Sequence, residues 1–187
     1  VVRWAKKRGI ALTAEVTPHH LLLTHDLLVD YDPVYKVNPP LRRREDTLAL
    51  QEAVVDGTID IIATDHAPHA AHDKDHAFAD AAFGMLGLET ALGVVLDTMV
   101  RQDRLDWAQV ADRMAYAPAR IAGLADHGQT LAVGNPANLV LVDPQRRVVI
   151  DRAQSASKSR NNPYHGRDLP DPVRLTLWAG RTTFRDL

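Results

Sequence analysis

The most informative hydrophobic pattern in the chain is a short apolar run at residues 59–63 (IDIIA), which is followed within six residues by Asp65, His66 and His69. Turn-forming residues lie before the run at Asp56 and Gly57 and after it at Pro68. An apolar segment of this length between turn residues is typical of a buried strand in a parallel sheet. Because ligand-binding and catalytic groups of parallel α/β folds lie at the carboxyl ends of strands, we expect Asp65 to belong to a site.

The segment before this strand predicts a strand and a helix. Residues 31–36 lead into a strand that we expect to end at Asn38, where two prolines rule out a helix and hold an extended loop. Residues 45–56 form a predicted helix, with acids in its first turn and a glycine just past its end. Strand, helix and the strand at 59–63 follow one another at the spacing of a βαβ unit.

The remainder of the chain predicts helices first and short strands later. We expect a strand at 10–16 and helices at 2–8 and 106–114, the last with Asp106 as N-cap and Gln109 completing a capping box. From residue 128 onward the apolar stretches are short, so we expect strands at 138–143, 148–150, 175–178 and 182–184, and a long connecting loop at 155–172. The predicted fold is α/β, with residues 1–127 in one domain and 128–187 in a smaller β-domain.

The most concentrated chemistry in the sequence is the cluster of Asp65, His66 and His69. Seen alone, Asp65 could be a helix N-cap or a turn residue. Imidazoles serve in metal binding, in acid–base catalysis and in anion binding, and the spacing leaves all three roles open. Pro68 argues against a helical zinc pair made by the two histidines, so we expect them on a loop that lines a pocket.

A second histidine pair, His19 and His20, follows the predicted strand at 10–16. Adjacent side chains of an extended segment point to opposite faces, so the two imidazoles cannot readily reach one ion. We therefore expect structural roles for both.

Charge and composition exclude several classes of partner. Lys and Arg number 22 against 24 Asp and Glu, for a formal charge of -2, and no basic stripe is present, so we expect neither nucleic acid nor a membrane surface as partner. The chain has no cysteine, so any metal site must use oxygen and nitrogen ligands. No signal-peptide pattern opens the chain and no apolar stretch spans a bilayer, so the cytoplasm is the expected compartment.

Four segments, in order, resemble dihydroorotases within the amidohydrolase superfamily of metal-dependent hydrolases. They are residues 35–42 (YKVNPPLR), 56–60 (DGTID), 63–69 (ATDHAPH) and 83–90 (FGMLGLET). The second histidine of ATDHAPH, His69, favours dihydroorotases of the class I bacterial type over hydantoinases and allantoinases, which usually carry other residues after the aspartate. The family more often has proline where this chain has Ala82, which predicts a less rigid loop.

The resemblance implies the carboxy-terminal part of a (β/α)8 TIM barrel, together with strands of a small composite β-domain. A complete barrel takes about 250 residues, so we expect 187 residues to be a fragment. The implied reaction interconverts (S)-dihydroorotate and N-carbamoyl-L-aspartate in pyrimidine biosynthesis. The implied cofactor is zinc, two ions in the full-length parent, with the other ligands upstream of Val1.

The resemblance also assigns roles to five residues. It implies that Asp65 is both a metal ligand and the catalytic proton shuttle, and that Asn38, His69, Phe83 and Gly84 bind the substrate. A homodimer or a pyrimidine-pathway complex is the implied assembly. Two alternatives stay open: a hydantoinase or dihydropyrimidinase, and a non-catalytic scaffold subunit related to dihydroorotase.

Overall fold

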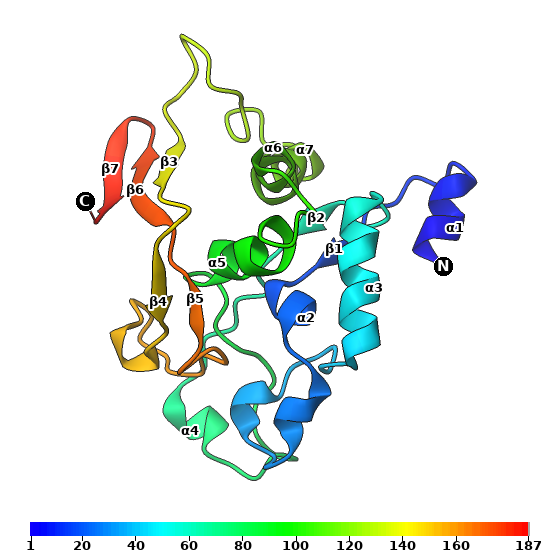
Figure 1. Ribbon diagram of the computed structural model, residues 1–187, viewed down its shortest axis with the longest axis vertical. Coiled ribbons are helices and arrows are strands. Elements are labelled where there is room, and N and C mark those ends of the chain that lie inside the picture. The colour runs from blue at the N-terminus through cyan, green and yellow to red at the C-terminus, as the bar shows by residue number, and fades with distance from the viewer. Residues whose placement is uncertain (187) are drawn as a thin grey trace.

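The computed structural model describes residues 1–186, and most of its helical segments precede residue 123 (Figure 1). The α-helices are α1 (Val2–Lys7), α2 (Pro18–Leu22), α3 (Arg44–Val55), α4 (Ala71–Lys74), α5 (Ala91–Val95), α6 (Trp107–Ala111) and α7 (Ala117–Ala122). Short 3-10 helices are η1 (His25–Leu28), η2 (Pro33–Tyr35) and η5 (Arg152–Gln154), and two π-helical turns are η3 (Leu96–Val100) and η4 (Asp112–Tyr116). The strands are β1 (Glu15–Val16), β2 (Ile61–Ile62), β3 (Leu139–Val142), β4 (Arg147–Val149), β5 (Asp168–Pro170), β6 (Val173–Trp178) and β7 (Arg181–Arg185). Within residues 1–186, no helix combines the length and the apolar character needed to cross a bilayer.

The strand predicted at 59–63 is confirmed, and its neighbour in the sheet is parallel to it. β2 pairs with β1, with Glu15 opposite Ile61 and Val16 opposite Ile62. The predicted helix at 45–56 is confirmed as α3, which lies between the two strands along the chain. A crossover of this kind is the basic unit of a parallel α/β fold.

The prediction of a strand that ends at Asn38 is wrong. Pro33 begins the 3-10 helix η2, and the carboxylate of Asp32 accepts a hydrogen bond from the Val34 N–H and so caps it. Lys36 is extended but lies in no strand, and its carbonyl accepts hydrogen bonds from the Gly84 N–H at 2.9 Å and from the Lys74 ammonium at 3.5 Å. Asp32 and Pro33 start a short helix where a strand was expected. The strand that pairs with β2 is therefore the earlier one, β1.

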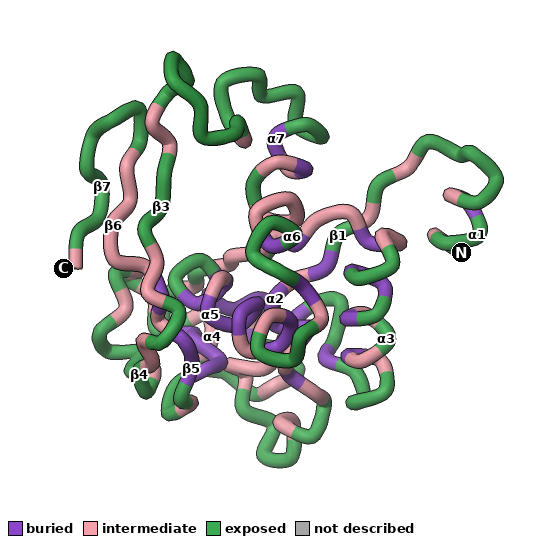
Figure 2. The backbone as a smooth tube through the Cα atoms, turned by 45° about the horizontal axis from the view of Figure 1, so that its top comes forward, coloured by how far each residue is buried: buried purple, intermediate pink, exposed green. Residues whose placement is uncertain are grey.

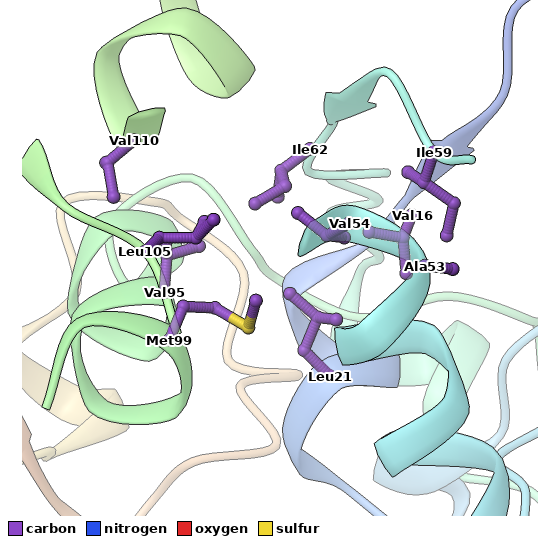
Figure 3. Close-up of a cluster of buried hydrophobic side chains, with 10 residues drawn as sticks. All are labelled: Val16, Leu21, Ala53, Val54, Ile59, Ile62, Val95, Met99, Leu105 and Val110. Carbon is purple, nitrogen blue, oxygen red and sulfur yellow. The ribbon is translucent and has the colours of Figure 1, made fainter. Parts of the chain in front are cut away.

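A cluster of buried aliphatic side chains holds the parallel pair between helices (Figure 3). Val54 of α3, Leu21 of α2 and Met99 of η3 are fully buried, and Ile62 of β2 lies among them. Burying one such side chain contributes about 1.5–3 kcal/mol relative to leaving it in water. The cluster therefore fixes where β2 ends and where the chain beyond it begins.

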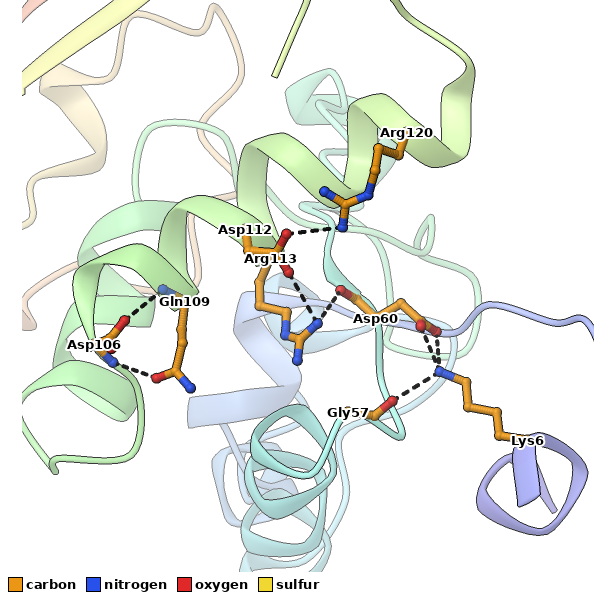
Figure 4. A network of polar contacts seen from close by, with 8 residues as sticks. All are labelled: Lys6, Gly57, Asp60, Asp106, Gln109, Asp112, Arg113 and Arg120. Atoms are coloured by element: carbon orange, nitrogen blue, oxygen red, sulfur yellow. Dashed lines mark hydrogen bonds and ion pairs between the residues drawn. The ribbon is translucent and has the colours of Figure 1, made fainter. Parts of the chain in front are cut away.

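A polar network fixes the start of β2 from two sides (Figure 4). Lys6 of α1 donates to the carboxylate of Asp60 at 2.6 Å and to the carbonyl of Gly57 at 3.0 Å. Arg113 donates to the carbonyl of Asp60 at 3.3 Å. Burial raises the pKa of Asp60, but the Lys6 ammonium and the Ala14 N–H hold that pKa below its usual value.

The predicted capping box at Asp106 is confirmed. The Gln109 N–H donates to Asp106 at 2.7 Å, and the Asp106 N–H donates to the side chain of Gln109 at 2.8 Å. The helix continues beyond the predicted end through η4 and α7 to residue 122. Proline has no N–H to donate, and the π-helical turn just before Pro118 lets the helix continue past it.

The second half of the chain forms two antiparallel sheets, β3–β6–β7 and β4–β5. The four strands expected there are confirmed, while β5 was missed because it lies inside the predicted loop at 155–172. The β3–β6–β7 sheet lies apart from the buried centre of the molecule and is largely exposed (Figure 2). Strand β5 packs on α5, where any side chain at Gly93 would overlap the carbonyl oxygen of Pro170. The division into domains at residue 127 stays a prediction.

Candidate functional site

Asp65 lies just beyond the carboxyl end of β2, as expected, and its side chain is exposed. Its backbone has a φ of 47°, in the left-handed region that a non-glycine residue adopts at an energetic cost. Aspartate tolerates this conformation better than most residues. Within residues 1–186 no hydrogen bond occupies its carboxylate, so both oxygens remain available to a ligand.

His19 and His20 are both buried, in agreement with the structural roles expected from the sequence. His20 has Nδ1 2.7 Å from the hydroxyl of Thr17 and Nε2 3.0 Å from the carbonyl of Pro39. A carbonyl only accepts, so Nε2 carries the proton. Burial lowers the pKa of His20, although the nearby carbonyls of the two prolines and the charge of Asp65 oppose that shift. His20 thus fixes the loop that follows Asn38, whose side chain is exposed.

His19 is 1% exposed, and burial together with the neighbouring imidazole lowers the pKa of His19 to about 3. Its Nε2 has no hydrogen-bond partner among the described residues. A neutral, enclosed imidazole of this kind belongs to the packing of α2 and is not available as a surface acid or base.

His69, Phe83 and Gly84 are brought together by the structure. The Nε2 of His69 lies 2.7 Å from the carbonyl oxygen of Phe83, so this nitrogen donates and Nδ1 is left for another partner. Gly84 has a φ of 124°, and a Cβ there would lie 2.5 Å from the Cβ of Ala67 and 3.0 Å from the Nε2 of His69. Only glycine permits this close approach of the two loops.

Three of the four backbone groups of the Phe83–Gly84 pair are already bonded within the chain. The Phe83 carbonyl accepts from His69, the Gly84 N–H donates to Lys36, and the Gly84 carbonyl accepts from Lys74 at 3.0 Å. Among residues 1–186 the Phe83 N–H has no such partner. It is therefore the backbone group of this pair that a ligand can reach.

His66 joins the same two loops. Its Nδ1 accepts from the Gly87 N–H at 3.1 Å and from the Leu88 N–H at 3.3 Å, which requires the proton of the neutral ring to be on Nε2. The Ala67 N–H donates to the carbonyl of Met85 at 3.0 Å. His66 therefore acts as an acceptor for backbone groups, in a role that the sequence did not indicate.

Two lysines donate hydrogen bonds to backbone carbonyls of residues 79–82, just before the Phe83–Gly84 pair. Lys36 is buried and donates to the carbonyls of Ala79 and Ala81 at 2.8 and 2.6 Å, and its ammonium lies 4.4 Å from the centre of the Phe83 ring. Lys74 of α4 donates to the carbonyl of Ala82 at 2.8 Å. Burial and the charge of Lys36 lower the pKa of Lys74 to about 8, because neither factor favours its charged form.

Ala82 replaces the proline that the resembling family more often has, and its N–H is used. It donates to the carbonyl of Asp73 at 2.9 Å, a hydrogen bond that proline cannot make. The expected loss of rigidity at this position is thus offset by a hydrogen bond to α4.

Asn161, in the segment that the sequence left without a role, contacts both site loops. It is 5% exposed, and its side-chain amide donates to the carbonyl of Ala67 at 2.8 Å and to that of Gly84 at 3.2 Å. Its side-chain oxygen accepts from the His69 N–H at 3.4 Å. The sequence signal for this residue was that residues 160–163 (RNNP) resemble a segment of the dihydroorotase family whose role is not indicated by the sequence.

The described residues do not form a complete metal site. Within residues 1–186 no group of three or more His, Asp or Glu side chains is arranged to hold an ion, whereas protein zinc sites usually have three or four protein ligands. The exposed, unbonded carboxylate of Asp65 fits one coordination position. No hydrogen bond among the described residues joins Asp65 or Asn38 to the group formed by His69, Phe83 and Gly84.

The sequence profile of the amidohydrolase family matches residues 4–182 of the chain. The dihydroorotase of Streptomyces coelicolor is 59% identical over 186 residues, which cover all of this chain and 44% of that protein. The dihydroorotase of Mycobacterium leprae is 52% identical over 185 residues, covering 99% of this chain and 43% of that protein. The chain therefore spans less than half the length of the curated relatives it matches.

Among solved structures, the L-hydantoinase (dihydropyrimidinase) from Arthrobacter aurescens superposes with a TM-score of 0.90 at 30% identity, covering 98% of this chain and 42% of that one. A D-hydantoinase (dihydropyrimidinase) from a Thermus species superposes with a TM-score of 0.88 at 26% identity, covering 99% of this chain and 42% of that one. The chain thus has the mixed α/β structure of a portion of a hydantoinase-like fold.

The close contact at Gly84 generates a prediction about stability. Gly84→Ala should lower the melting temperature of the intact protein more than Gly166→Ala, because both residues have positive φ but nothing lies within 4 Å of the Cβ that Gly166 would gain. A non-glycine residue in the left-handed region costs roughly 1–2 kcal/mol, and the overlap with Ala67 adds to that cost only at Gly84. Differential scanning calorimetry of the two variants measures this difference, and equal shifts would show that the loops are not in close contact.

Proposed function

The chain belongs to the amidohydrolase family, and we propose on that premise that the protein it forms part of is a dihydroorotase. The proposed reaction opens the cyclic amide of (S)-dihydroorotate to N-carbamoyl-L-aspartate, and closes it again. One observation carries the proposal: identity to a dihydroorotase reaches 59% over the whole chain, against 30% to the L-hydantoinase that has nearly the same backbone.

We place the chain in the carboxy-terminal part of a (β/α)8 barrel, with residues 128–187 contributing to a small β-domain. The parallel pair β1–β2 with α3 as its crossover supports this proposal, since adjacent barrel strands are joined in this way. The position of Asp65 beyond the carboxyl end of β2 is also where barrel enzymes carry their catalytic groups. The resemblance to dihydroorotases supports a cytoplasmic location.

Asp65 is proposed to move the proton during the reaction. In the hydrolytic direction water attacks the ring amide carbon, the carbon–nitrogen bond breaks, and the proton lost by the water passes through the Asp65 carboxylate to the leaving nitrogen. Its exposed side chain, with no competing hydrogen bond, supports this role. Zinc, when bound, lowers the pKa of water and polarises the amide carbonyl. Asp65 is the one ligand that this chain would supply, and the remaining ligands would come from residues outside it.

His69 and Phe83 are proposed to hold the substrate's carboxylate. With Nε2 of His69 already donating to Phe83, a hydrogen bond from this ring to a carboxylate uses Nδ1 and so requires the doubly protonated imidazolium. Such a bond is charge-assisted and strong. The Phe83 N–H is the backbone donor beside it. Gly84 contributes by permitting the close approach, and Asn38 would offer a donor and an acceptor to the ring amide.

A hydantoinase is the second candidate, favoured by the solved structures that superpose on the chain. Its substrates share the cyclic amide but lack the ring carboxylate of dihydroorotate. A non-catalytic scaffold is a third candidate, and the free carboxylate of Asp65 counts against it. The two tests that follow separate the three candidates.

The first test concerns proton transfer. Asp65→Asn in the intact protein should lower kcat for both ring opening and ring closure by about 10²–10⁴, because the amide keeps the shape but cannot accept the proton. Steady-state assays in both directions measure this effect. A variant within about threefold of the wild type would remove Asp65 from catalysis, and a wild type without activity would favour the scaffold.

The second test concerns the carboxylate. Hydrogen bonds to charged groups contribute about 1.5–3 kcal/mol, so His69→Ala should lower kcat/KM for dihydroorotate by about 10- to 150-fold. Any activity on dihydrouracil, which has no carboxylate, should change much less. Assays of wild type and variant on both substrates decide the matter, and parallel losses would mean that His69 only braces its loop.

A further inference from the structure

Asn161 lies 92 positions beyond His69 in the sequence, yet it is bonded to both loops that carry the proposed substrate contacts. We propose that Asn161 is a positioning residue. Its buried amide would set the distance between residues 67–69 and residues 83–86, and so aim the His69 ring and the Phe83 N–H at the same ligand. The inference rests on the proposed function for its ligand, but its structural part can be tested separately.

The side-chain nitrogen and oxygen of Asn161 both take part in these contacts. Its amide nitrogen donates at 2.8 Å to Ala67 and at 3.2 Å to Gly84, and its oxygen accepts at 3.4 Å from His69. A side-chain amide has two N–H donors and an acceptor oxygen, whereas an ionised carboxylate has no donor and a hydroxyl has only one. Its backbone carbonyl also accepts from the Leu86 N–H at 3.0 Å. One residue therefore bonds each loop at two points.

The two loops are not joined to each other by a regular ladder of strand hydrogen bonds. Their backbone contact is an isolated parallel bridge between His66 and Met85, reinforced by the hydrogen bond from the Ala67 N–H to Met85. The carbonyls of Ala67 and Gly84 both point to the amide of Asn161. Without Asn161, the Ala67 carbonyl would have no donor among residues 1–186 and the Gly84 carbonyl would keep only Lys74, so the spacing of the two loops would be less firmly held.

The segment that carries Asn161 is anchored on both sides of it. Upstream, the carboxylate of Glu89 accepts from the Ala156 N–H at 2.9 Å and from the Ser157 N–H at 3.2 Å. Downstream, Tyr164 is 1% exposed and packs in the second hydrophobic cluster with Met85 and Leu169. Asn161 is thus presented to the loops from a fixed backbone, as a positioning residue must be.

The neighbouring residue Asn162 provides a matched control. It is of the same type and equally buried, at 4% against 5% exposed, but within residues 1–186 its side chain makes only a local hydrogen bond, accepting from the Tyr164 N–H at 2.9 Å. Asn162→Asp keeps that acceptor. Asn161→Asp keeps the acceptor for His69 but loses both donations, and it places a carboxylate against two carbonyls.

The first experiment is kinetic and uses the intact protein. Asn161→Ala and Asn161→Asp should lower kcat/KM for dihydroorotate by between about 10-fold and 100-fold, mostly through KM, while Asn162→Asp stays within about threefold of the wild type. Adding Asn161→Ala to His69→Ala should cost much less than Asn161→Ala alone, since the ring to be aimed is gone. Full additivity, or an Asn161→Ala variant with wild-type kinetics, would overturn the proposal.

The second experiment does not depend on activity. Hydrogen–deuterium exchange of the intact protein should be faster at residues 66–70 and 83–87 in Asn161→Ala than in the wild type, and unchanged there in Asn162→Asp. Unchanged exchange in Asn161→Ala would refute the positioning role whatever the kinetics. Faster exchange in a protein that does not act on dihydroorotate would retain the positioning role and reject the proposed function.

Discussion

The backbone polar groups of two irregular loops, at residues 63–70 and 79–87, need hydrogen-bond partners that no strand ladder provides. Side chains provide them instead: Lys36, Lys74 and Asn161 donate to carbonyls, and His66 accepts from N–H groups. Unpaired polar groups are costly away from water, so these four side chains stabilise both loops together with backbone hydrogen bonds such as that from the Ala67 N–H to Met85. The rest of the site depends on this constraint.

The same constraint limits which groups can meet a substrate. Most of the backbone around Phe83 and Gly84 is bonded within the chain, which leaves the Phe83 N–H, the Nδ1 of His69 and the carboxylate of Asp65. These are a donor, a nitrogen that can become a donor, and an acid. Such a set suits a substrate with a negative group at one end and a reacting amide at the other, in keeping with the proposed function.

The parts of the fold that could be predicted from sequence are those determined by local signals. The apolar run that became β2 and the capping box at Asp106 each lie within a few residues of the chain, and both were predicted correctly. The strand expected before Asn38 failed because Asp32 and Pro33 together start a 3-10 helix, a local signal that outweighed the apolar pattern. Strand β5 was missed because its pairing with β4 spans a long loop.

In the site, too, the features set by neighbouring residues could be predicted and those set by distant contacts could not. Asp65 could be placed from its position after a strand, whereas the contact of His69 with Phe83 and the role of Asn161 depend on residues 14 and 92 positions from His69. No periodicity or spacing connects them. Only the folded chain shows that three distant segments meet at one side-chain amide.

The two loops are proposed to recognise a cyclic amide that bears a carboxylate. The most direct test is the ratio of kcat/KM for dihydroorotate to kcat/KM for dihydrouracil, measured with the intact wild-type protein loaded with zinc. A group that binds the carboxylate with a charge-assisted hydrogen bond predicts a preference for dihydroorotate of at least about 10-fold. Equal values, or a preference for dihydrouracil, would show that no group of the site recognises the carboxylate.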